Sequence, residues 1–278
     1  MHPILLKIGN FELRSWSVAI ALSFLVGTVV AVKRTYRFGV NPDHVIDLAI
    51  VIIIASTVGS RLLYALYHLD HYTGNWLAIV NPFHHGKFGF AGLSMVGGVI
   101  LALIASWVFV RIQKLSFLTM GDIIAPGFLL GAGIQRLGGC FLNGCCFGLA
   151  TDSLLGVSFP KTLGPYPPGT PLWPAQLFAS AFGFLGFALI CWLERHYRFP
   201  GATFWLVLLY YPIDRFIVDQ FRYYEPTQIL GRIGPLTINA NHLLIGGLFV
   251  LSAVFWLRGW LKQRSQSQMD TTSEVASI

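Results

Sequence analysis

The chain has 278 residues, of which 55% are hydrophobic and only 11% carry a formal charge, and its mean hydropathy is +0.64. Soluble domains carry about 25% charged residues, so this chain has too little polar surface to cover a water-soluble fold. The composition excludes a disordered chain, a disulfide scaffold and a cytosolic enzyme, and it predicts an integral membrane protein. The net charge of +7 then indicates membrane topology rather than a nucleic-acid partner.

Seven apolar stretches are long enough to form membrane-spanning helices, each of which needs about 20 residues. The predicted spans are 15–32, 48–69, 88–110, 123–147, 175–193, 199–217 and 239–257. We therefore expect an all-α integral membrane protein, a seven-transmembrane-helix bundle formed by a single domain over residues 1–262. The remaining tail, 263–278, is polar and Ser-rich, and we expect it to be disordered and cytoplasmic.

The basic residues of the connecting loops indicate how the bundle is oriented. If the N-terminus lies outside, ten Lys and Arg residues fall in inner loops and six in outer loops. This bias predicts an outer N-terminus and a cytoplasmic C-terminus. Three longer outer segments, 70–87, 149–174 and 219–238, are expected to form a small, irregular extracytoplasmic cap. The second of them contains six Pro residues, which exclude both a helix and a central strand.

Three predicted spans each contain an arginine, namely Arg61, Arg136 and Arg215. An Arg at membrane depth costs about 2.5–3.5 kcal/mol on insertion scales, so it normally faces a partner or a cavity. The acids available at this depth are Asp122, Asp214 and Asp219. Because these acids are few, we favour an oxyanion such as a lipid phosphate over a purely internal ion-pair network. A guanidinium binds such a group with two N–H donors.

The sixth predicted span contains a polar stripe. Tyr211, Arg215, Asp219 and Arg222 are spaced four, four and three residues apart, so on a helix they share one face. Pro212 adds a kink, and kinked spans tend to line cavities. Salt bridges on a helix surface would explain two contacts, but they would not explain why the stripe enters an apolar span.

Two glycine-rich segments allow a helix or a lipid head group to approach closely. One runs over residues 89–98 and the other over 136–148, and tight packing alone explains them equally well. The second segment also contains Cys140, Cys145 and Cys146. Their spacing fits a zinc site poorly, because structural zinc is usually held by four ligands in paired spacing. We favour a role as small buried residues for these cysteines.

Together these motifs resemble those of the prolipoprotein diacylglyceryl transferase family. The similarity extends over nearly the whole chain, and the motif in the sixth span is the most specific part of it. The similar segments are 2–16, 59–64, 92–98, 122–126, 136–148, 174–178 and 211–222.

The resemblance implies a multi-pass enzyme of the bacterial cytoplasmic (inner) membrane. The family transfers diacylglyceryl from phosphatidylglycerol to the lipobox cysteine thiol of a prolipoprotein and releases glycerol phosphate. The implied partners are this or a related anionic phospholipid, the prolipoprotein or another acceptor, and the lipid bilayer, but no nucleic acid, metal or organic cofactor. The residues predicted to be catalytic are Arg136, Arg215 and Asn143. Those predicted to bind substrate are Arg61, Gly97, Gly98, Gly148, Gln176, Tyr211, Asp219 and Arg222.

The chain also departs from the family pattern. The family's proposed catalytic His corresponds to Val96, and Trp16 and Trp173 stand where the family has a Tyr and a His. In the segment 136–148, cysteines replace an Asn and a Glu of the family, and one residue is added. An added residue rotates a helix by about 100°, unless a bulge at Gly138-Gly139 absorbs it.

Without the family's His, the acceptor thiol needs another means of activation. A positive field from arginines beside the phosphate would lower the pKa of the thiol. His84 and His85 are the remaining candidates for a general base. Three functions stay open: a divergent diacylglyceryl transferase, a paralogue that uses the same phospholipid site for another acceptor or head-group reaction, and a non-catalytic lipid-binding or lipid-transporting protein.

Overall fold

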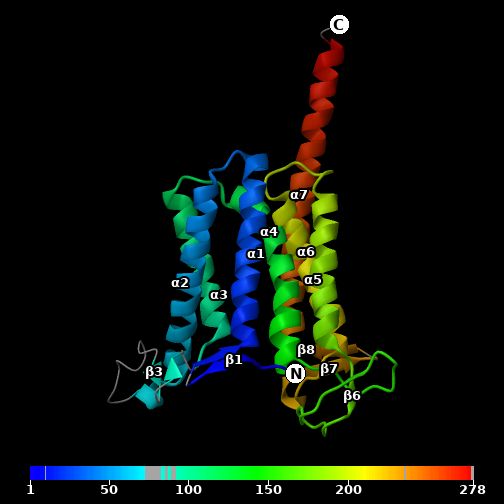
Figure 1. Ribbon diagram of the computed structural model, residues 1–278. Helices are drawn as coiled ribbons and strands as arrows, with labels where there is room; N and C mark the ends of the chain where they lie inside the picture. Colours follow the sequence, from blue (N-terminus) through cyan, green and yellow to red (C-terminus); the bar gives the residue numbers. More distant parts are fainter. Residues whose placement is uncertain (10, 73–82, 85–86, 89–91, 235, 277–278) are drawn as a thin grey trace. The chain divides into compact units, whose positions relative to one another are not determined.

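The computed structural model describes residues 1–9, 11–72, 83–84, 87–88, 92–234 and 236–276. Seven helices of 18 or more residues dominate this part of the chain (Figure 1). They are α1 (Ser15–Phe38), α2 (Pro42–Tyr67), α3 (Met95–Ile112), α4 (Phe117–Ile134), α5 (Ala175–Leu193), α6 (Ala202–Phe221) and α7 (Ala240–Ala276). All except α6 belong to six helical segments that are long and apolar enough to cross a membrane. This mainly helical architecture is that of an integral membrane protein.

Helix α6 is the exception among these long helices, and it contains three charged residues, Asp214, Arg215 and Asp219. The predicted span 199–217 is shifted toward the C-terminus in the structure. Gly201, with φ of +88°, precedes the helix, which then continues to Phe221. Arg222 therefore lies one residue past the helix, in extended backbone, and the prediction of four residues on one helical face is wrong for Arg222.

Short two-stranded sheets lie between the helices of the described part, in addition to the expected all-α framework. The pairs are β1 (Ile4–Ile8) with β2 (Phe11–Arg14), β3 (Phe83–His84) with β4 (Lys87–Phe88), β5 (Val157–Ser158) with β6 (Pro171–Leu172), and β7 (Ile229–Ile233) with β8 (Leu236–Asn239). The Pro-rich segment 149–174 is otherwise irregular, as its composition predicts. Most of the predicted cap segment 70–87 lies outside the described residues.

Helix α4 continues directly into the π-helix η3 (Gln135–Phe141). A π-helix holds one more residue per turn than an α-helix, and this one contains Gly138 and Gly139. The sequence left open whether a bulge at these glycines absorbs the added residue, and the structure has such a bulge. The helix ends well before residue 147, because Gly144 and Cys146 have positive φ angles of 70° and 58°.

Helix α7 extends much further than the predicted span 239–257. It covers 37 residues, Ala240–Ala276, so the structure describes as helical most of the tail for which the sequence predicts disorder. No Gly or Pro follows Gly259, so nothing in the sequence interrupts the helix once it has formed.

The described residues form two compact units, whereas the sequence predicts one domain. Unit 1 contains Met1–Leu5, Arg14–Ala31 and Gly121–Ile278, and unit 2 contains Leu6–Leu13 and Val32–Met120. In unit 2, helix α2 packs chiefly against α3. A Cβ atom on Gly59 or Gly97 would collide with the backbone carbonyl of the other, so these two glycines permit the close approach of the helices.

Glycines also permit close helix packing in unit 1. A Cβ on Gly127 of α4 would lie 2.7 Å from the carbonyl oxygen of Gly27 of α1. Helix α6 begins at a side-chain cap supplied from another helix, since Asp122 of α4 accepts hydrogen bonds from the backbone N–H groups of Gly201 (2.7 Å) and Phe204 (2.8 Å). A carboxylate at this position satisfies free N–H groups and the positive end of the helix dipole. Asp122 thus has a structural partner inside the protein.

Candidate functional site

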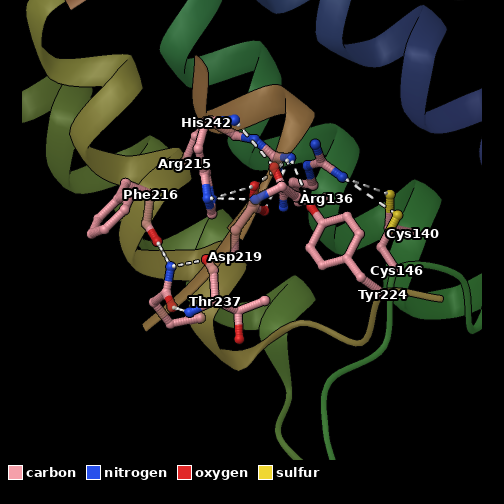
Figure 2. A network of polar contacts seen from close by, with 11 residues as sticks. Arg136, Cys140, Cys146, Arg215, Phe216, Asp219, Tyr224, Thr237 and His242 are labelled. Atoms are coloured by element: carbon pink, nitrogen blue, oxygen red, sulfur yellow. Dashed lines mark hydrogen bonds and ion pairs between the residues drawn. The ribbon is translucent and has the colours of Figure 1, made fainter. Parts of the chain in front are cut away.

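A polar cluster lies within unit 1, where η3, the end of α6 and the start of α7 come together (Figure 2). Two of the arginines predicted at membrane depth, Arg136 and Arg215, belong to it. The cluster has two halves. Helices α6 and α7 supply one half, and η3 with the loop that follows it supplies the other.

In the α6 half, Arg215 forms an ion pair with Asp219 at 3.0 Å, one helical turn away. The Asp219 side chain is completely buried. Arg215 also donates a hydrogen bond to the hydroxyl of Tyr224 at 3.4 Å, and the Arg222 guanidinium lies 5.0 Å from the centre of the Tyr224 ring. Tyr224 therefore connects the two arginines. Burial raises the pKa of Tyr224, so its hydroxyl stays protonated and can donate a hydrogen bond.

Helix α7 supplies His242, whose Nε2 lies 3.5 Å from an Asp219 oxygen. Asn239 and His242 form a reciprocal helix cap: the Asn239 N–H donates to His242 Nδ1 (3.3 Å), and the His242 N–H donates to Asn239 Oδ1 (3.1 Å). Because Nδ1 accepts a hydrogen bond, the proton of a neutral His242 is on Nε2, which faces the carboxylate. Only Nδ1 of His242 is hydrogen-bonded: Nε2 is buried beside Asp219 and has no hydrogen-bond partner among the described residues.

In the other half, Arg136 donates from one guanidinium nitrogen to Cys140 Sγ (3.5 Å) and Cys146 Sγ (3.6 Å). Arg136 also interacts electrostatically with Tyr211 and Asp214 of α6. Arg136 therefore links the two halves of the cluster.

The sulfur atoms beside Arg136 form a small network of their own. Contact with the side chains of Cys140 and Cys145 lowers the pKa of Cys146, and the positive charges of Arg222 and Arg136 lower it further. Contact with the other two sulfurs and burial raise the pKa of Cys145, whose thiol donates to the Cys140 carbonyl oxygen at 3.7 Å. Cys146 is thus the member of the network that carries negative charge most readily.

Positive charge is in excess in the cluster. Three arginines (Arg136, Arg215 and Arg222) are matched by two buried acids, Asp214 and Asp219. The Nε of Arg222 is buried and has no hydrogen-bond partner among the described residues. A buried guanidinium donor without a partner costs free energy unless a ligand accepts from it, and a phosphate oxygen suits it. The arrangement can therefore bind an anion and stabilise charge that develops on a phosphate.

Three further predicted residues lie beside the cluster and hold the loop after η3 in place. Gln176, at the start of α5, donates to the Cys145 carbonyl at 2.9 Å, and Asn143 donates to Ser15 Oγ (3.0 Å) and to a backbone carbonyl of η3. Gly148 is required for close backbone approach, since a Cβ there would lie 2.7 Å from the Phe221 carbonyl oxygen. These contacts are structural, and the catalytic or binding roles of the three residues stay predictions.

The remaining predicted residues belong to unit 2. Arg61 is buried, donates to the Gly92 carbonyl at 3.2 Å and lies 5.5 Å from the centre of the Tyr72 ring. Gly97 and Gly98 line the contact of α3 with α2. Their roles toward substrate stay predictions. The side chain of His84 and all of His85 lie outside the described residues.

Sequence reasoning missed Tyr224 and His242. His242 had a detectable signal, because Asn239 and His242 stand at the N-cap and third positions of the last apolar run, in capping-box spacing. Tyr224 had none, because it follows the end of α6 and no helical periodicity places it.

The fold and the site together define a multi-helix membrane protein with a buried cluster suited to an anionic group. A family model for prolipoprotein diacylglyceryl transferase matches residues 3–258, so the chain belongs to this family. Among its relatives, the phosphatidylglycerol–prolipoprotein diacylglyceryl transferase of Clostridium tetani is 31% identical over 253 residues, which are 91% of this chain and 97% of that protein. The enzyme of the same name from Geobacter sulfurreducens is 30% identical over 256 residues, covering 90% of this chain and 92% of that protein. A second such transferase from Clostridium perfringens is 28% identical over 250 residues, covering 90% and 94%.

Proposed function

We propose that this chain is a phosphatidylglycerol–prolipoprotein diacylglyceryl transferase, as its relatives are named. It moves diacylglyceryl from phosphatidylglycerol to a lipobox cysteine thiol and releases glycerol phosphate. The observation that carries this proposal is the excess of guanidinium groups in the unit 1 cluster, where the buried Nε of Arg222 has no hydrogen-bond partner in the described part of the chain. A family whose donor is an anionic phospholipid needs such a site for the phosphate.

The reaction forms a carbon–sulfur bond and breaks a carbon–oxygen bond. The acceptor thiolate attacks the glyceryl carbon that bears the phosphate, and the bonding electron pair leaves with the phosphate oxygen. Negative charge therefore develops on the phosphate in the transition state. Arg136 and Arg215 supply N–H donors and positive charge there, and Arg222 adds an Nε donor that has no partner among the described residues.

Asp219, Tyr211 and Tyr224 support the arginines of the cluster. Asp219 holds the Arg215 guanidinium by an ion pair, and the Tyr224 hydroxyl accepts from the same nitrogen. The Tyr211 ring packs edge-on against Phe128 of α4, with ring centres 5.6 Å apart. For Arg61, Gly97 and Gly98, which belong to unit 2, the proposal keeps the predicted role in substrate binding.

The proposal includes a topology. Helix α6 is the seventh span: its polar residues belong to the cluster, whereas Ile213 and Ile217 are exposed on the helix and suit a lipid environment. The N-terminus and the segment 149–174 face the outside of the bacterial inner membrane, and the C-terminus faces the cytoplasm. Labelling of an Asp152→Cys variant by a membrane-impermeant maleimide in intact spheroplasts tests this. Labelling only after lysis would overturn the orientation.

The experiment that tests the activity uses the purified full-length protein with phosphatidylglycerol and a lipobox peptide, followed by mass spectrometry of every product. The proposal predicts a diacylglyceryl thioether on the peptide and an equal amount of glycerol phosphate. Glycerol phosphate without a modified peptide would favour the paralogue with another acceptor, for which the replacement of the family's His by Val96 is the specific observation. Absence of any phospholipid turnover would favour a non-catalytic lipid-binding protein.

A further inference from the structure

Three cysteines converge on one point beside the candidate phosphate site. The Sγ atoms of Cys140, Cys145 and Cys146 all lie within 4.8 Å of one another, although their spacing in the sequence fits a zinc site poorly. The π-helix ends with Cys140 near its C-terminus, and the chain then turns back through Gly144 and Cys146, both of which have positive φ. A non-glycine residue in this backbone region is uncommon and marks a local constraint.

The geometry of the three sulfurs suits a metal ion. A tetrahedral Zn²⁺ site with Zn–S bonds of about 2.3 Å places its sulfurs about 3.8 Å apart. The sulfurs would therefore need to move closer by 1 Å or less. In the described part of the chain, no fourth His, Cys, Asp or Glu ligand joins the group. Three protein ligands with an open fourth position are typical of catalytic rather than structural zinc.

The surroundings of the sulfurs fit a charged metal–thiolate centre. Three thiolates and Zn²⁺ carry a net charge of −1, and Arg136 donates hydrogen bonds to two of the three sulfurs. Such N–H donors around metal-bound sulfur stabilise the centre and orient its ligands. Gln176, which is buried, holds the loop by its hydrogen bond to the Cys145 carbonyl. Cys140 is buried and Cys145 is exposed, so the group is closed on one side and accessible on the other.

We propose that Cys140, Cys145 and Cys146 bind one zinc ion, whose open fourth position takes the sulfur of the acceptor cysteine. This proposal rests on the proposed transferase function, and it gives that function a way to activate the acceptor without the family's His. A thiol that binds zinc loses its proton to solvent and stays nucleophilic as a thiolate. The bound sulfur then attacks the glyceryl carbon, the carbon–oxygen bond breaks, and its electron pair leaves with the phosphate. No oxidation or reduction takes place, and the zinc ion is regenerated when the thioether product leaves.

The binding part of the proposal is tested on full-length protein in detergent micelles, reduced and stripped of metal with a chelator. Addition of Zn²⁺ should restore one bound zinc per chain, measured by elemental mass spectrometry. Addition of Co²⁺ instead should produce the intense near-ultraviolet absorption of cobalt–thiolate bonds. The variants C140S, C145S and C146S should each weaken metal binding by at least about tenfold. The matched control is C191S, because Cys191 lies fifteen residues beyond Gln176 on α5, about 22 Å along the helix.

The acceptor part is tested by titrating a lipobox peptide into the Co²⁺ form. The visible cobalt bands should shift as the peptide sulfur occupies the fourth position, and the same peptide with Ser in place of its Cys should cause no shift. This spectrum reads out thiol binding independently of phospholipid turnover. If the shift occurs but no lipidated peptide forms, the transferase function fails and the metal site stands.

Three results would overturn the proposal. The first is that the reduced protein binds no stoichiometric Zn²⁺ or Co²⁺, for example because two of the cysteines are found only as a disulfide. The second is that metal binds but the peptide thiol leaves the cobalt spectrum unchanged. The third is full transferase activity in protein shown to contain no metal.

Discussion

The two halves of the polar cluster hold their arginines in different ways. In the α6 half, Arg215 is neutralised by the buried carboxylate of Asp219, and His242 of the next helix lies with Nε2 3.5 Å from that carboxylate. In the η3 half, Arg136 contacts two sulfur atoms instead. The α6 half carries the motif that most resembles the family, whereas the η3 half contains the cysteines that depart from it. Under the proposed function, the α6 half is the part of the site that binds phosphate and the η3 half is the part that differs in how the acceptor is activated.

The largest effect on the reaction rate is expected from replacing Arg215 in the α6 half. In Arg215→Lys a point charge replaces the planar guanidinium, which contacts both Asp219 and Tyr224. We expect kcat for glycerol phosphate release to fall on the order of 10²–10³-fold, as for loss of a donor to developing negative charge. The control is Arg232→Lys on the exposed strand β7, which should retain activity. Equal rates for the two variants would show that Arg215 does not act on the phosphate.

The second largest effect is expected on stability, from a change at Gly148, where the backbone after η3 lies against the end of α6. In Gly148→Ala the added Cβ would clash with the carbonyl oxygens of Trp173 and Phe221. We expect a loss of about 1–3 kcal/mol in stability, seen as a lower Tm in detergent. Gly231→Ala serves as the control, because no atom of the described residues lies within 4 Å of a Cβ at that position. An unchanged Tm for Gly148→Ala would show that the backbone at Gly148 has room for a Cβ beside the carbonyl oxygens of Trp173 and Phe221.

A smaller effect should come from His242→Gln. Gln is a common residue at the third position of a capping box, so the helix cap with Asn239 is preserved while the imidazole contact with Asp219 is lost. We expect kcat to fall about tenfold, roughly 1.4 kcal/mol, with Tm nearly unchanged. Asn239→Ala is the complementary variant and should lower Tm instead, by removing the cap. If His242→Gln lowers only Tm, His242 has a structural role alone.

The smallest effect is expected from restoring the family's residue in Val96→His. Val96 is 56% exposed on α3, so the larger side chain fits there without strain. Because we assign activation of the acceptor thiol to the η3 half, the rate with a lipobox peptide should change by no more than about twofold, or roughly 0.4 kcal/mol. A tenfold gain would show that the missing base limits the enzyme. A His84→Ala/His85→Ala double variant, measured in parallel, should also leave the rate unchanged.

Local sequence patterns determined much of this protein. Apolar runs identified the six helical segments that are long and apolar enough to cross a membrane, Arg136 and Arg215 stood out as charges within apolar runs, and an added residue near Gly138-Gly139 raised the possibility of the bulge that η3 forms. Each of these features depends on a few neighbouring residues and on the helical period, which a sequence displays directly. The motifs also identified the family.

Only the tertiary structure decided how separate segments meet. Tyr224 and His242 joined the cluster because the chain after α6 folds back and α7 starts beside Asp219, and neither event follows from a local period. The convergence of Cys145 and Cys146 on Cys140 depends on two positive φ angles in the turn after η3. Side-chain distances between elements depend on how helices pack and how loops turn. Helix packing and loop conformation depend on many weak contacts at once. The sequence spacing of the three cysteines therefore could not show that their sulfur atoms meet.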